Sequence, residues 1–210
     1  MSKAASTEAL VIKAPNLQTL AIRITGKSPY MQHRFSKKAT IMAKQAEGST
    51  ARGKKAHAAR DFEQDFRDAQ HRSAEGWLGI PAPAFRAALI SACRLVGFQM
   101  TKAKLSVFVE ADGVCAKDGT PLVRLDGGEP EMNTAAVRNE TGVVDIRARP
   151  LWREWGATVR LTFDADQFTA QDVLNLLARA GLQVGIGEGR PDSKKSAGLG
   201  YGLFTVEVGA

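Results

Sequence analysis

Hydrophobic and polar residues alternate in several separate segments of the chain. Between residues 17 and 25, Leu20, Ile22 and Ile24 fall on one face and polar or small side chains on the other, which is typical of a half-buried strand. Further strands are expected over residues 104–110, 122–125, 143–149, 157–163 and 202–208.

Two other segments show the 3.6-residue period of an amphipathic helix. A continuous apolar face runs through residues 84–97, behind a Pro-Ala-Pro entrance. Thr169 and Asp172 form a T-x-x-D capping box at the start of a second helix, residues 170–180, and Gly181 is expected to end it.

The order of these elements predicts an α+β fold. With two insertions set aside, it fits a ferredoxin-like or RRM-like antiparallel sheet with two helices and one strand to spare. Residues 1–16 are expected to be a flexible N-terminal arm, and residues 17–210 a single RRM-like domain. The insertions are placed at about 31–75, after the first strand, and at about 111–141, and a glycine-rich loop precedes the last strand.

Composition is that of a globular protein, and the charge is concentrated in the first insertion. The 210 residues are 44% hydrophobic and 24% charged, with a net charge of +7. Residues 31–60 carry eight basic residues against one acidic residue, whereas residues 76–210 carry fifteen of each. The insertion is therefore predicted to be a basic, mobile excursion with short helices at about 36–46 and 54–72. An anionic partner is expected, and nucleic acid is the commonest one.

Several classes of protein are excluded by the same sequence. No apolar run approaches the roughly 18 residues of a membrane span, and no secretory signal is visible. Cys93 and Cys115 make neither a disulfide framework nor a metal cluster, and His33, His57 and His71 show no metal-ligand spacing. We expect a cytoplasmic protein with no metal or other cofactor, and each histidine at the surface.

Glycine recurs through residues 185–202. A mononucleotide site is disfavoured, because glycine-rich phosphate loops follow a strand and lead into a helix, and this one does the reverse. Glycine nevertheless lets a backbone approach a polyanion closely, and Arg190, Lys194, Lys195 and Ser196 can contact phosphates. The loop is predicted to make such contacts; the alternative is a flexible segment whose lysines are merely solvated.

The basic insertion supplies the other predicted contacts. Aromatic residues at its base could stack on nucleic-acid bases, and its lysines and arginines could neutralise phosphates. These predicted contacts are Tyr30, His33, Arg34, Phe35, Lys37, Lys38, Lys44, Arg52, Lys54 and Lys55.

Three short motifs stand at the borders of predicted elements: Gly-x-Ser-Pro at 26–29, Ile-Pro-Ala-x-x-Phe-Arg at 80–86 and Gly-Leu-Gly-Tyr-Gly at 198–202. Together they resemble the RAMP superfamily, the RRM-like RNA-binding proteins of CRISPR systems. Within it the chain is most similar to the backbone subunit that polymerises along the guide RNA. The overall pattern, with S-P-x-M-x-H at 28–33, R-x-R-P-x-W at 147–152 and G-I-G-x-x-R-P at 185–191, is also similar to uncharacterised proteins of tailed phages. The resemblance implies that Arg86, with the basic residues of the glycine-rich loop, contacts the backbone of a single strand.

The sequence thus favours a non-catalytic protein that binds single-stranded RNA or DNA and self-associates along the strand, in the bacterial host cytoplasm if a phage encodes it. Two alternatives stay open. One is a metal-independent endoribonuclease with His33 as the general base, although the catalytic His or Asp motif of RNA-cleaving RAMP proteins is not evident. The other is a phage structural or inhibitory protein that acts through protein contacts alone.

Overall fold

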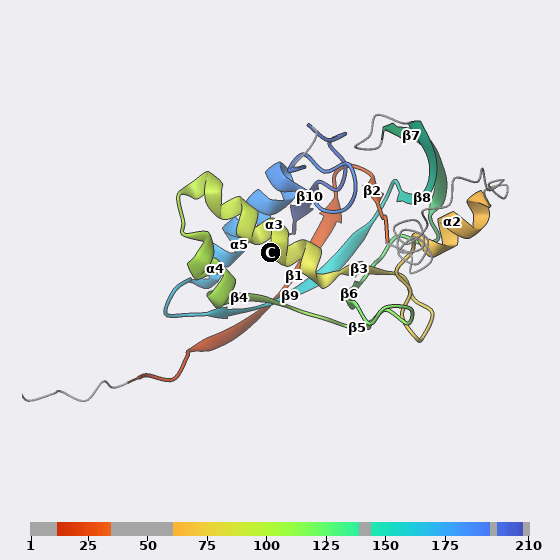
Figure 1. Ribbon diagram of the computed structural model, residues 1–210. Coiled ribbons are helices and arrows are strands. Elements are labelled where there is room, and N and C mark those ends of the chain that lie inside the picture. The colour runs from red at the N-terminus through yellow and green to blue at the C-terminus, as the bar shows by residue number, and fades with distance from the viewer. Residues whose placement is uncertain (1–11, 35–60, 139–143, 194–196, 208–210) are drawn as a thin grey trace, which may run out of the picture.

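A four-stranded antiparallel sheet lies at the centre of the computed structural model, which describes residues 12–34, 61–138, 144–193 and 197–207 (Figure 1). In spatial order its strands are β10 (Phe204–Val206), β1 (Leu17–Gly26), β9 (Gly156–Asp164) and β4 (Val107–Glu110). The expected alternation of β1 is confirmed, because Ile22 and Ile24 are buried and their neighbours on the strand are exposed or half-buried.

Two helices, α3 (Ala82–Ala92) and α5 (Ala170–Arg179), pack on this sheet. Phe85 of α3 and Leu177 of α5 are fully buried and join Ile24 of β1 in one hydrophobic core. The predicted capping box is present: the Thr169 hydroxyl accepts from the backbone N–H of Asp172, and the Asp172 carboxylate accepts from that of Thr169. Figure 1 shows both helices on the same side of the sheet.

Each of these helices continues as a short irregular turn. A 3-10 turn, η1 (Cys93–Val96), follows α3, and a π turn, η2 (Ala180–Val184), follows α5. The expectation that Gly181 ends the second helix is wrong, because the chain stays helical to Val184. Gly185, with φ 73°, adopts the positive φ that follows the last turn.

The remaining strands form two smaller antiparallel sheets among the described residues. One contains β2 (Tyr30–Met31), β8 (Val144–Trp152) and β7 (Glu131–Arg138), and the other contains β3 (Gly79–Pro81), β6 (Pro121–Arg124) and β5 (Gly113–Val114). The β7–β8 hairpin arches away from the helices, beside the helix α2 (Phe62–Asp68) (Figure 1).

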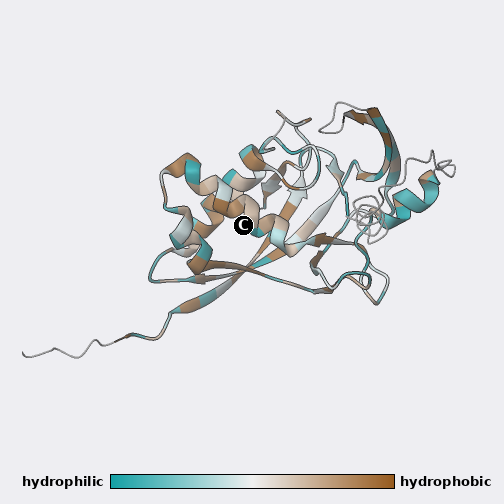
Figure 2. Ribbon diagram, viewed as in Figure 1, coloured by the Kyte–Doolittle hydropathy of each residue, from teal (hydrophilic) through white to brown (hydrophobic). Residues whose placement is uncertain are grey.

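The first insertion is shorter at its C-terminal end than expected. α2 confirms part of the helix predicted at 54–72; residues 54–60 and the helix predicted at 36–46 lie outside the described residues. Apart from Phe62 and Phe66, the side chains of α2 are hydrophilic, as the mainly teal helix of Figure 2 shows, and none of its residues is buried. Directly after α2, however, Gln70, His71 and Ser73 are buried, so the chain has rejoined the body of the protein before residue 75.

The strand predicted at 104–110 is wrong in its first half. Met100–Ser106 form a helix, α4, and the strand begins only at Val107. Leu105, which the alternation places on a buried face, is 79% exposed. The α+β class with antiparallel pairing is confirmed. None of the described helices has the length and apolarity to cross a bilayer.

Candidate functional site

The glycine-rich segment after α5 folds back onto the turn that follows β1. The backbone N–H of Gly202 donates to the Pro29 carbonyl at 2.7 Å, and that of Ile186 donates to the Gly202 carbonyl at 3.0 Å. Gly202 has φ 69°, and a Cβ there would lie 1.8 Å from the Ile186 oxygen. A Cβ at Gly187 would lie 2.6 Å from the Met31 carbonyl oxygen. Glycine therefore permits this close packing, and a larger residue does not.

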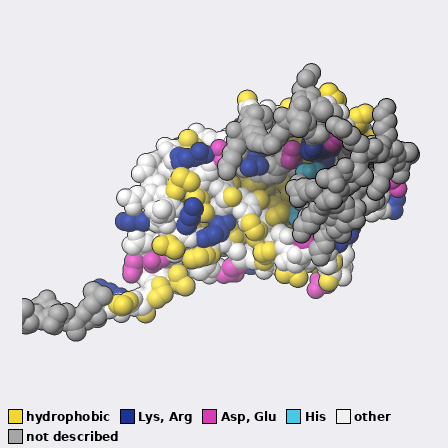
Figure 3. Space-filling model, viewed as in Figure 1, with side chains coloured by type: hydrophobic (Ala, Val, Ile, Leu, Met, Phe, Trp, Pro, Cys, Tyr) yellow, Lys and Arg dark blue, Asp and Glu magenta, His cyan; other side chains and the backbone are white. Residues whose placement is uncertain are grey.

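A cleft of about 290 Å³ lies between this loop, the start of the first insertion and α3. Residues of the glycine-rich loop line the cleft on the side of η2. On the side of α3 it is lined by the small side chains of Ala84, Ala87 and Ala88. His33 and His71 line it as well, together with Tyr30, Gln32 and Pro81. In Figure 3, apolar and histidine side chains lie next to each other at the border of the residues that are not described. The small side chains leave room for an extended ligand.

The charged groups of the loop are held by partners. Arg190 donates through Nη1 to the Gly187 carbonyl at 3.0 Å. The Asp192 carboxylate accepts a hydrogen bond from the Ser91 hydroxyl and lies 2.7 Å from the Arg94 guanidinium. The hydrogen bond from Ser91, and then Arg94, lower the pKa of Asp192, so this carboxyl is ionised at neutral pH. The Asp192 contacts tie the end of the loop to the end of α3.

A second carboxylate of the loop, Glu188, lies beside a buried arginine. The Arg149 guanidinium of β8 is 3.3 Å from the Glu188 carboxylate. Its Nε and Nη2 are buried and form no hydrogen bond in the described part of the chain, so the two groups attract each other without hydrogen-bond geometry. Burial lowers the pKa of Arg149, and the Glu188 charge opposes that shift. The pair balances a negative charge that would otherwise face an anionic ligand.

Each predicted basic segment has one described neighbour in the lining of this cleft. His33 lines the cleft and stands two residues before Phe35 in the sequence, and Asp192 lines it and stands two residues before Lys194. The predicted contacts that lie outside the described residues are Phe35, Lys37, Lys38, Lys44, Arg52, Lys54, Lys55, Lys194, Lys195 and Ser196.

Comparison with known proteins adds nothing to this geometry. No protein-family model and no curated protein matches the chain. The candidate site is therefore judged on its own side chains.

Tyr30 is a core residue, which corrects the expectation that it stacks on a base. Its side chain is 1% exposed, and its ring centroid lies 5.5 Å from that of Trp152 and 5.2 Å from that of Trp155. Its hydroxyl accepts a hydrogen bond from Gln32 Nε2 at 3.0 Å. Burial raises the pKa of this phenol. Aromatic packing leaves no ring face for a nucleotide base.

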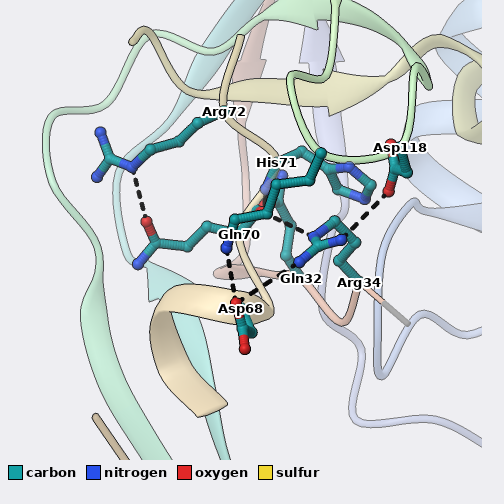
Figure 4. Close-up of polar contacts among 8 residues, drawn as sticks. Gln32, Arg34, Asp68, Gln70, His71, Arg72 and Asp118 are labelled. Carbon is teal, nitrogen blue, oxygen red and sulfur yellow. Dashed lines mark hydrogen bonds and ion pairs between the residues drawn. The ribbon is translucent and has the colours of Figure 1, made fainter. Parts of the chain in front are cut away.

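Arg34 has a structural role in place of the predicted phosphate contact. Its side chain is 5% exposed and lies 3.8 Å from the Asp68 carboxylate and 3.5 Å from that of Asp118. Its Nε donates to the Gln70 carbonyl at 3.2 Å (Figure 4). This buried cation joins the end of α2 to the hairpin between β5 and β6, and it is not available to an external anion.

Arg86 also serves the fold. Its Nε donates to the Val107 carbonyl at 3.3 Å, its Nη2 donates to the Lys104 carbonyl, and its guanidinium lies 5.3 Å from the centroid of the Phe108 ring. These bonds satisfy carbonyls at the end of α4, where a helix leaves acceptors unpaired. The structure does not bring Arg86 to the cleft.

His71 is the cleft residue that sequence reasoning missed. It was expected at the surface but is 8% exposed, and it lies beside Cys115 and Asp118. Its backbone N–H donates to Gln32 Oε1 at 3.1 Å. The 43 residues between His71 and Cys115 give no spacing signal, because two insertion segments meet only in the folded chain.

A larger cavity, of about 960 Å³, lies between α5 and η1, but two of its reactive side chains are already engaged in other contacts. Asp172, on its wall, is engaged in the capping box, and the Cys93 thiol donates to the Leu89 carbonyl at 3.4 Å. Burial raises the pKa of Cys93 and keeps it a thiol. We therefore place the candidate site at the smaller cleft.

The packing of the glycine-rich loop can be tested with two glycines of similar backbone conformation. Gly200 has φ 72° with no atom within 4 Å of an added Cβ, whereas Gly202 faces the Ile186 carbonyl. Gly200→Ala should cost about 1–2 kcal/mol from backbone strain alone, and Gly202→Ala at least about 3 kcal/mol. Urea unfolding measures both; equal losses would contradict the close approach at Gly202.

The link between Asp192 and α3 predicts a pH dependence. Because the folded-state pKa lies below the ordinary value of 3.8, ionised Asp192 stabilises the protein above that pH, and the stabilisation is lost as the pH falls through the folded pKa. Asp192→Asn should therefore lower the free energy of unfolding at pH 7 by up to about 1 kcal/mol, since the group is partly exposed. In denaturant titrations the difference should shrink below pH 3.8; a pH-independent difference would contradict the assignment.

Proposed function

We propose that the protein binds single-stranded nucleic acid along the cleft, without catalysing a reaction, and self-associates along the strand. The observation that carries the proposal is that the two basic segments of the sequence join the protein at one cleft, next to His33 and Asp192. Sites that follow a single strand combine a groove with positive charges spaced along it. The tethering of both segments at one groove supports this arrangement.

A ferredoxin-like central unit supports the same proposal. We infer it because β1, α3, β4, β9, α5 and β10 follow one another as strand, helix, strand, strand, helix, strand, with β1 and β9 in the middle of the sheet. This is the fold that the resemblance to the RAMP superfamily implies. The other strands and α2 then stand as insertions into that unit.

The proposed mechanism is mainly electrostatic. The backbone N–H groups of Gly185, Ile186 and Glu188 donate to carbonyls of the protein, so phosphate contact is assigned to the basic side chains. Arg190 together with Lys194 and Lys195 neutralises phosphates. Pairing of Glu188 with Arg149, and of Asp192 with Arg94, reduces the repulsion that these carboxylates would otherwise exert. Sequence preference is expected to be weak, because these contacts address the backbone.

Self-association is supported by the β7–β8 hairpin. Val144 and Ile146 of β8 are 56% and 48% exposed on this projecting element. Apolar side chains on a projecting hairpin are suited to contact with a neighbouring subunit. Binding along a long strand should then be cooperative, and binding to a strand that holds one subunit should not.

An endoribonuclease is the alternative function, because His33 lines the cleft. Incubation of labelled single-stranded RNA with the protein in EDTA separates the two functions. Intact RNA supports a binding protein, whereas cleavage that His33→Ala abolishes would replace the proposal by the enzyme.

Binding should weaken steeply with salt. If about four phosphates are neutralised per subunit, log K should fall against log salt with a slope of about −3. The double variant Lys194→Gln/Lys195→Gln should reduce the steepness by about 1.4. Fluorescence anisotropy with labelled oligo-uridine and oligo-thymidine measures both values; salt-independent binding, or no binding at low salt, would overturn the proposal.

The position of the site can be tested with two arginines. Arg190 is at the cleft, whereas Arg160 of β9 pairs with Glu110 and Asp112 on the sheet face away from the core. Arg190→Ala should weaken binding at low salt by about 3- to 10-fold, and Arg160→Ala by less than about 2-fold. A loss confined to Arg160→Ala would move the binding surface to the open face of the sheet.

A further inference from the structure

Three potential metal ligands meet where the segment after α2 lies against the hairpin between β5 and β6. His71 belongs to the segment, and Cys115 and Asp118 belong to the hairpin. Their ligand atoms all lie within 4.8 Å of one another. Figure 4 shows His71 and Asp118 side by side next to Arg34.

The imidazole of His71 has an unsatisfied atom. The residue is 8% exposed, and its Nδ1 is buried without a hydrogen-bond partner in the described part of the chain. Buried polar atoms in native proteins are nearly always paired, and an unpaired one calls for a ligand, an ion or a water. This orphan nitrogen points to a ligand independently of the clustering of the three residues.

The hairpin holds the two other ligands in a fixed turn. The backbone N–H of Cys115 donates to the Thr120 carbonyl at 2.8 Å, and Asp118 Oδ1 accepts from the Thr120 N–H at 3.0 Å. The N–H of Ala116 donates to the carbonyl of Arg72, the residue next to His71, at 2.9 Å. These bonds fix the hairpin against the segment that carries the imidazole.

The donor set selects a borderline transition metal. Nitrogen, sulfur and oxygen ligands together suit Zn²⁺, whereas Mg²⁺ and Ca²⁺ take oxygen ligands. Tetrahedral zinc with bonds of about 2.0–2.3 Å places its ligand atoms roughly 3.3–3.8 Å apart. The three side chains therefore need to close by about 1.5 Å at most, which small rotations of the side chains supply.

We propose that His71, Cys115 and Asp118 bind one zinc ion, with water as the fourth ligand. Cys115 binds as the thiolate and releases its proton to solvent, while His71 binds through an imidazole nitrogen and Asp118 through a carboxylate oxygen. Arg34 keeps its ion pair with Asp68, 3.8 Å away, when Asp118 turns to the metal. His71 also lines the cleft, but the zinc proposal does not depend on nucleic-acid binding.

The experiment uses the full chain, stripped with EDTA and titrated with Co²⁺ as a spectroscopic probe. One Co²⁺ per chain should give a thiolate-to-cobalt charge-transfer absorption in the near ultraviolet, and Zn²⁺ should displace it. Cys93→Ser, at the chain's other cysteine, is the matched control and should keep the absorption. Cys115→Ser should lose it.

A second variant keeps the test decisive if Cys115→Ser does not fold. Asp118 reaches solvent, so Asp118→Asn should keep the wild-type circular dichroism and bind Zn²⁺ at least about 10-fold more weakly. Zn²⁺ should raise the thermal midpoint of the wild type and of Cys93→Ser, and that of Asp118→Asn much less. Three results would each overturn the proposal. They are no charge-transfer absorption in the wild type, the same absorption in folded Cys115→Ser, and a Zn²⁺ affinity of Asp118→Asn equal to that of the wild type.

Discussion

The packing of the glycine-rich loop on the turn after β1 is the constraint on which the cleft depends. Gly202 passes close to Ile186 and donates to Pro29, so a segment near the C-terminus is fixed against one near the N-terminus. His33 and Asp192 meet in one cleft as a result, although 158 residues lie between them. The same closure adds β10 to the edge of the sheet beside β1.

The placement of charge follows from this closure and from burial. The net charge of +7 does not describe one uniform basic surface, because some of the basic residues serve the fold. Arg34 and Arg149 are buried beside carboxylates, and Arg86 caps α4. A buried ion pair is costly to break but is no attractor for an outside polyanion.

Local sequence patterns predicted the elements that bury one face and expose the other. The alternation of β1 and the capping box of α5 follow directly from the sequence, because one face of each element is buried and the other is wet. The strand β7 gave no such signal, since neither face of this hairpin strand is fully buried over the positions described.

At 104–110 the end of a helix and a strand share one short run of alternating hydrophobic and polar residues, and the boundary at Val107 depends on the tertiary bonds of Arg86. Of the cleft, the sequence allowed only the two basic segments beside it to be predicted. The clustering of His71, Cys115 and Asp118 could not be predicted, because it brings together residues far apart in the sequence.

Amide hydrogen exchange with and without a single-stranded oligonucleotide tests the central claim most directly. If the strand lies along the cleft, the amides of residues 185–193 and of the segment around His33 should exchange more slowly in the complex. The amides of α5, none of whose residues lines the cleft, should not change. Protection confined to the open face of β9 and β4, with none in the glycine-rich loop, would contradict the account.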